Sequence, residues 1–86
     1  MNARYVIEQE VLDVFLQLPV RRREKLLSVL AQLADHPQAD DPVSHRDETG
    51  RLIRQRTISG WTVWYWLDGA VDEVRVLDIE APRSRR

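Results

Sequence analysis

The chain has 86 residues, of which 43% are hydrophobic and 31% are charged, and its formal net charge at pH 7 is −1. This length and composition predict one globular domain, residues 1–86, with a single modest core, and they exclude a disordered chain. Because the chain has no cysteine, disulfides and thiolate metal sites are excluded, and a sequence pI near 6.1 is low for a protein that binds nucleic acid.

The first half of the chain predicts a short strand and two helices. Residues 1–11 lack the basic-then-apolar pattern of a signal peptide, and no apolar run approaches membrane-spanning length. We therefore expect a soluble, cytoplasmic protein without membrane contact. Residues 3–8 alternate as a strand, after which apolar side chains recur at helical spacing until Pro19 ends the first helix. A second helix is predicted over residues 20–35, and the two amphipathic helices form a hairpin that needs a sheet to cover its apolar stripes.

Three consecutive arginines, Arg21, Arg22 and Arg23, begin the second predicted helix. They could form a phosphate-binding patch, or they could be a solvated face of the helix. Positive charge is least favourable at the N-terminal end of a helix, and this run lies at that end.

Residues 36–50 form the only long polar segment, and two prolines and a terminal glycine predict that it is a loop. Its His36 and His45 could bind a metal together with nearby carboxylates, but their spacing matches no metal-site signature. We expect no metal and no cofactor. His45 stays of interest because it lies near the start of the following strand.

Three strands are predicted over residues 51–58, 61–67 and 72–79. Ser59-Gly60 and Asp68-Gly69 are turn signals, so the strands should form an antiparallel meander. Apolar residues occupy both faces of the last strand, which predicts that it is central or covered. We expect the hairpin and the sheet to share one core, comprising Leu12, Phe15, Leu26, Leu30, Leu33, Val63, Tyr65, Val76 and Ile79.

The first two of these strands carry arginines and tryptophans. The period of two puts Arg54 and Arg56 on one face of the first strand, and Thr62, Trp64 and Trp66 on one face of the second. A surface with guanidinium groups beside indole rings would suit single-stranded nucleic acid, whose phosphates bind arginine and whose bases stack on tryptophan. The alternative is that the tryptophans belong to the core and the arginines to a solvated strand face.

Taken in order, these segments resemble the RelE/ParE superfamily of toxins from bacterial toxin–antitoxin operons. The resemblance rests on FLQLP at 15–19, KLLSVLAQLADHP at 25–37, GRLIRQR at 50–56, SGWTVWYWLDG at 59–69 and VRVLDI at 74–79. It implies an α+β fold in which an N-terminal helical hairpin packs on a twisted antiparallel sheet, with the N-terminal strand joining the meander.

The resemblance also implies a function and partners. RelE-like toxins cleave mRNA on the ribosome, whereas ParE-like toxins inhibit DNA gyrase and are not nucleases. Either kind is silenced by a cognate antitoxin, and a homodimer or a toxin–antitoxin hetero-oligomer is compatible with this. A third reading is a superfamily relic that acts as a binding module. Of the three readings we expect the RelE-like nuclease, which would make the chain a metal-independent endoribonuclease.

For the nuclease, the resemblance implies catalytic roles for Arg54, Arg56 and Arg83. The family often has an arginine two positions after the turn glycine, where this chain has Thr62, and its C-terminal tyrosine has no counterpart before Arg86. Arginine is a poor general base, so His45 is a candidate for proton transfer. The residues expected to contact RNA are Arg51, His45, Thr62, Trp64 and Trp66.

Overall fold

The computed structural model describes residues 4–36 and 43–83. Within these residues two helices and five strands follow one another in an α+β arrangement. The elements are β1 (Arg4–Ile7), α1 (Gln9–Gln17), α2 (Val20–Asp35), β2 (Val43–Arg46), β3 (Leu52–Ile58), β4 (Trp61–Asp68) and β5 (Glu73–Glu80).

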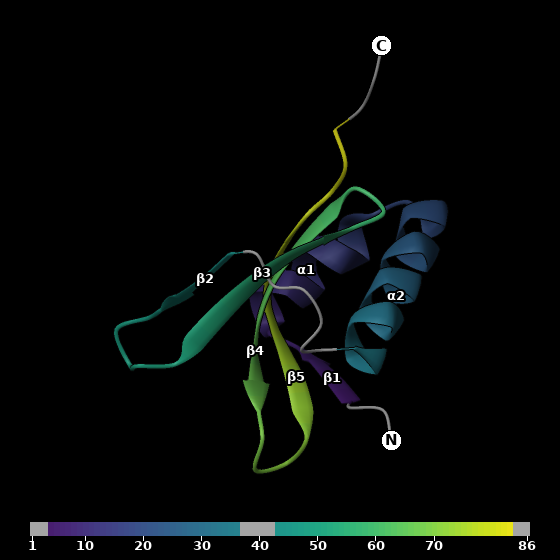
Figure 1. The fold of residues 1–86 in the computed structure, drawn as a ribbon. Coiled ribbons are helices and arrows are strands. Elements are labelled where there is room, and N and C mark those ends of the chain that lie inside the picture. Colours follow the sequence, from purple (N-terminus) through teal and green to yellow (C-terminus); the bar gives the residue numbers. More distant parts are fainter. Residues whose placement is uncertain (1–3, 37–42, 84–86) are drawn as a thin grey trace.

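The strands form a single sheet in the order β1-β5-β4-β3-β2 (Figure 1). β3, β4 and β5 are the expected antiparallel meander, and β1 joins it by pairing in parallel with β5. β5 therefore has a hydrogen-bonded neighbour on each side, which confirms that the last strand is central. The sheet as a whole is mixed, because the β1–β5 pair is parallel while the other pairs are antiparallel.

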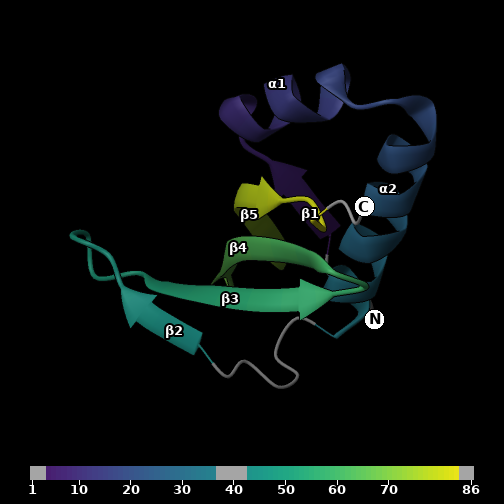
Figure 2. The ribbon, with the colours of Figure 1, turned by 90° about the horizontal axis from the view of Figure 1, so that it is seen from above.

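Pro19 separates the two helices. It has no N–H to donate, so it is tolerated where α2 begins, and it cannot continue α1. The side chain of Arg23 donates a 2.9 Å hydrogen bond to the carbonyl of Leu18, one of the acceptors that the end of α1 leaves open. Figure 2 shows α1 lying over β1 and β5, whereas α2 runs beside the turn that joins β3 to β4.

The core lies between the helices and one face of the sheet. Of the residues expected there, most are fully buried, and Phe15 and Ile79 pack against the margin. The prediction that Leu12 belongs to the core is wrong, because Leu12 is only half-buried. The neighbouring Val11, at 2% exposure, is the buried residue of α1. The buried cluster comprises Val11, Leu26, Val29, Leu30, Leu33, Trp61, Val63, Tyr65, Val74 and Val76.

A β-bulge explains the two-sided apolar pattern of β5. Trp64 pairs with Asp78 and Tyr65 with Val76, so Leu77 is an extra residue on β5. The insertion shifts the alternation by one position and brings Ile79 onto the same face as Val76. Val76 and Ile79, which strict alternation would place on opposite faces, therefore both contact the core.

The predicted loop over residues 36–50 contains a strand. β2 is antiparallel to β3, with His45 opposite Ile53, and it forms one edge of the sheet. The connection to β3 is closed by hydrogen bonds between Asp47 and both Gly50 and Arg51. The polar composition predicted only a loop, because β2 has no apolar face of its own. Its strand conformation comes from backbone pairing with β3 at the edge of the sheet.

The two meander turns differ in length. Ser59 and Gly60 form a two-residue turn with φ of 52° and 85°, the positive values that such hairpins favour. The β4–β5 connection is longer than the tight turn predicted at Asp68-Gly69, because Asp68 pairs with Glu73 across residues 69–72. Asp72 adopts a positive φ of 56° there.

Candidate functional site

The sheet separates the arginines from the tryptophans that were expected to share a surface. Arg54 pairs with Tyr65 and Arg56 with Val63, and residues opposite one another project from the same face. Both arginines therefore lie on the face that carries the core, which we call the inner face. Trp64 pairs instead with Gln55, on the outer face. The expectation that Arg54 and Arg56 share a surface with Trp64 and Trp66 is wrong.

The turn between β3 and β4 causes this separation. Ile58 and Trp61 pair directly across its two residues, so each even-numbered residue of β3 faces an odd-numbered residue of β4. Arg54 and Arg56 are even-numbered, as are the tryptophans at 64 and 66. A hairpin of this length must put them on opposite faces.

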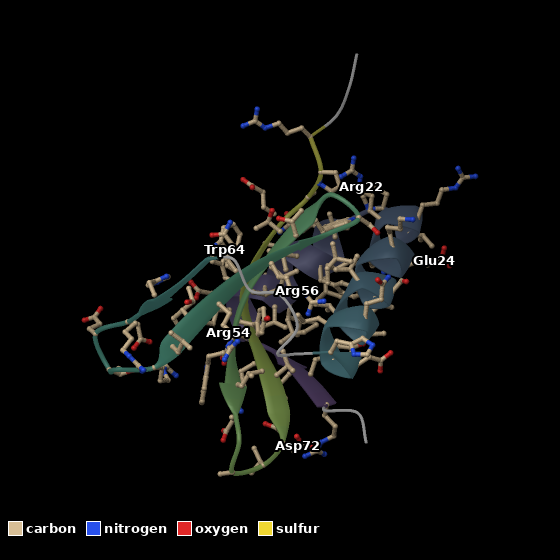
Figure 3. All side chains as sticks on the ribbon, viewed as in Figure 1. Arg22, Glu24, Arg54, Arg56, Trp64 and Asp72 are labelled. Carbon is tan, nitrogen blue, oxygen red and sulfur yellow. The ribbon has the colours of Figure 1, made fainter. Side chains whose placement is uncertain are left out.

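Arg56 holds the end of α2. Its Nη1 donates a 2.6 Å hydrogen bond to the carbonyl of His36, the residue that caps α2. Figure 3 shows Arg56 between β3 and the helix. A cation at this position satisfies a free carbonyl and lies at the negative end of the helix dipole. Arg54, also half-buried, lies on the same inner face.

The outer face gathers the residues expected to contact RNA. The indole Nε1 of Trp64 donates to Oε1 of Gln55 at 3.2 Å, and Trp66 lies between two guanidinium groups. The Cζ atoms of Arg51 and Arg75 are 4.8 Å and 5.8 Å from its ring centroid, within the range of cation–π attraction. The expected residues found on or beside this face are Arg51, His45, Thr62, Trp64 and Trp66.

Carboxylates are interspersed among these groups. Asp78 is opposite Trp64 and Glu80 is opposite Thr62, so the β5 side of the outer face is acidic. Its cations are already paired: Arg51 contacts Asp47 at 3.1 Å, and Arg75 contacts both Glu73 and Glu8. The outer face thus offers ring surface but little unneutralised positive charge for phosphates.

Arg75 was missed by sequence reasoning. It lies in the segment VRVLDI, whose apolar residues predicted a strand. Alternation along that segment puts Arg75 on the same face as Trp66, which could have identified it, and the structure pairs the two residues directly.

Arg83, the third expected catalytic residue, is exposed beyond the end of β5. The preceding Pro82 packs on the β3–β4 turn, since a Cβ built on Gly60 would lie 3.1 Å from Cβ and Cγ of Pro82. This contact ties the segment after β5 to the turn, whereas Arg56 is bound to the C-terminal end of α2. Arg83 therefore follows a segment that lies beside the start of α2, whereas Arg56 lies at the end of that helix.

Asp47 organises the β2–β3 turn. Its carboxylate accepts a 2.6 Å hydrogen bond from the hydroxyl of Thr49, which is the main cause that lowers its pKa to about 2. The backbone N–H groups of Arg51 and Thr49 and the Arg51 guanidinium act in the same direction. Among residues 4–36 and 43–83, no cluster of three or more His, Asp or Glu side chains is arranged to hold a metal ion.

Solved structures show what this architecture is similar to. The RelBE2 toxin–antitoxin complex of Mycobacterium tuberculosis matches 94% of this chain and 99% of its own chain, with a TM-score of 0.72 and 14% identity. The isolated RelE toxin of E. coli matches 95% of this chain and 87% of its own, with a TM-score of 0.67 and 19% identity. The archaeal RelE–RelB complex from Pyrococcus horikoshii matches both chains over 100%, with a TM-score of 0.67 and 17% identity.

The chain has the RelE-toxin fold. The fold expected from the sequence is therefore confirmed. No family model matches the chain, and no curated protein matches it. Because the identities are 14–19%, the likeness to these RelE structures concerns the fold. Of the two helices that the structure describes, neither is long and apolar enough to cross a membrane.

Proposed function

We propose that this chain is the toxin of a type II toxin–antitoxin module and that its partner is a cognate antitoxin. The observation that carries the proposal is the RelE fold, which extends over nearly the whole chain with a TM-score up to 0.72. Two of the similar structures were solved as complexes of a toxin with its antitoxin. A toxin of this kind would act in the cytoplasm, where both the ribosome and DNA gyrase are found.

We further propose that the toxin acts by binding its target, with DNA gyrase as the ParE-like candidate. Cleavage of RNA by its own 2′-hydroxyl needs a base, an acid and cations around one phosphate. Arg54 and Arg56 lie on the inner face, whereas Thr62 and Trp64 lie on the outer face. Arg56 is also bound to the C-terminal end of α2. Arginine is moreover a poor general base. The register of β3 and β4 thus favours binding over cleavage.

The RelE-like mRNA endonuclease is the second candidate, with the ribosome and mRNA as partners. It is favoured by the outer face, where Trp64 and Trp66 supply ring surface, Arg51 supplies a cation and His45 supplies a group that can transfer protons. In this reading Arg54, Arg56 and Arg83 would act as catalytic cations, which requires them to reach the same phosphate.

Inducible expression in bacterial cells tests the toxin assignment. We expect growth arrest when the chain is expressed alone, and recovery when the small protein encoded beside it is expressed as well. Purified DNA gyrase should lose supercoiling activity when the chain is added. No growth effect from a folded, soluble product would contradict the toxin assignment and favour a relic that serves as a binding module.

A further inference from the structure

The first turn of α2 carries three arginines, although positive charge is unfavourable at the N-terminal end of a helix. This turn has no acidic residue and no side-chain cap. Of the three arginines only Arg23 has a structural partner, the carbonyl of Leu18. Arg21 and Arg22 make no hydrogen bond or ion pair with any described residue. A local conflict without structural compensation is typical of a functional site.

A pocket of about 280 Å³ lies beside these arginines. α2 contributes cations to one side of it, and the β3–β4 turn and the segment after β5 form the other side. Figure 3 shows Arg22 between the start of α2 and this turn. The lining residues are Arg21, Arg22, Lys25, Ser59, Trp61 and Pro82.

The floor of the pocket is apolar and held in place. Trp61 is only 2% exposed because its ring is part of the core. Pro82 is positioned by its close approach to Gly60, at 3.1 Å from the Cβ that an alanine would have. The pocket therefore combines a fixed apolar surface with a rim of unpaired cations.

We propose that this pocket binds an acidic peptide segment that places one apolar side chain against Pro82, above the buried ring of Trp61. Carboxylates on either side of that side chain would pair with Arg21, Arg22 and Lys25, since charge-assisted hydrogen bonds to arginine are the strong ones. The segment belongs to the antitoxin, and for that source the inference rests on the proposed function. Arg21 and Arg22 would then bind a ligand and would not be only a solvated face of α2.

A peptide fits this pocket better than nucleic acid does. The net charge of the chain is −1, so a long polyanion gains no general attraction toward the molecule. The buried ring of Trp61 does not present a face on which a base could stack. The chain's own last four residues, RSRR, are basic and do not complement a basic rim.

A nuclear magnetic resonance titration of the full chain with the acetylated, amidated peptide Glu-Leu-Asp-Glu tests the proposal. We expect shifts at the Trp61 indole N–H and at the amides of Ser59 and Arg21. Replacing leucine by serine in the peptide should remove them. The double variant Arg21→Glu/Arg22→Glu should bind at least about tenfold more weakly. The control Arg4→Glu/Arg46→Glu, with the same change in charge on β1 and β2, should bind as the original chain does.

Each opposite result overturns the proposal. A flat titration at millimolar peptide, or equal binding by Arg21→Glu/Arg22→Glu, would show that the pocket does not take an acidic peptide. Shifts of the same signals with oligouridylate but not with the peptide would make it a nucleic-acid site. Absence of growth arrest with intact peptide binding would instead refute the toxin assignment, and with it the antitoxin as source, while the peptide pocket itself stands.

Discussion

Arg56 illustrates how one side chain can suggest catalysis in a sequence and structural support in a fold. It was expected to stabilise a phosphate, and its guanidinium instead holds the carbonyl of His36 at the end of α2. A basic residue on a strand is compatible with either role, and only the position of the helix end decides between them. Any loss of activity on removing Arg56 has to be separated from a loss of stability.

Arg56→Ala should therefore lower the free energy of unfolding by about 1 kcal/mol, the usual scale for a cation at a helix C-terminus. Denaturant unfolding followed by circular dichroism measures this. Arg56→Lys keeps the charge near the helix end and should recover part of the loss. An unchanged midpoint for Arg56→Ala would show that the bond to His36 contributes nothing.

Asp47 makes a pH-dependent contribution to stability. Its pKa in the folded chain, about 2, lies below the ordinary value of 3.8, so the folded state favours the carboxylate. The stabilisation is fully present above the ordinary pKa and is lost as the pH falls from there toward 2. We expect the unfolding midpoints of the original chain and Asp47→Asn to differ at pH 6 and to converge as the pH approaches 2. A difference that does not change with pH would contradict this.

At the scale of elements, α2 carries much of the core. Leu30 is completely buried, and Leu27 on the same helix is 41% exposed, which gives a matched pair. Leu30→Ala should cost roughly 2–5 kcal/mol of stability, because it removes buried atoms and leaves a cavity. Leu27→Ala should cost less than about 0.5 kcal/mol. Equal losses in denaturant unfolding would mean that α2 does not pack on the sheet through this face.

The β3–β4 turn depends on Gly60. Its φ of 85° is unfavourable for any residue with a Cβ, and that Cβ would press on Pro82. Gly60→Ala should destabilise the chain by about 1–3 kcal/mol. Gly69→Ala is the control, because Gly69 has no positive φ and no atom near its Cβ position, so it should be neutral or slightly stabilising. Similar melting temperatures for both variants would contradict the contact with Pro82.

The helices and the meander could be predicted from periodicity and turn residues, with the bounds of α2 matching residue for residue. β2 could not, because its pairing with β3 depends on a neighbour and not on its own apolar pattern. The faces of Arg56 and Trp64 could have been predicted, since a two-residue turn at Ser59-Gly60 fixes which residues pair. The bulge at Leu77 could not, because it appears only once β4 and β5 are aligned.

At the scale of the whole molecule, the chain keeps the RelE architecture while distributing its charged groups differently from what the nuclease reading requires. The sheet separates Arg54 and Arg56, on its inner face, from Trp64 and Trp66 on its outer face. The outer face also carries carboxylates, such as those of Asp78 and Glu80. Arg21 and Arg22, which have no ion-pair partner among the described residues, lie elsewhere, at the start of α2. A toxin that binds its target and its antitoxin is consistent with that distribution.

Mapping of mRNA ends on translating ribosomes, after induction of the chain in growing cells, tests this view most directly. We expect growth arrest with mRNA that remains intact on the ribosome, because Arg54 and Arg56 lie on the inner face, away from His45 and the tryptophan rings. New mRNA ends within ribosome-bound codons, lost in a Trp64→Ala variant that still folds, would contradict binding as the mode of action and would make the chain a RelE-like nuclease.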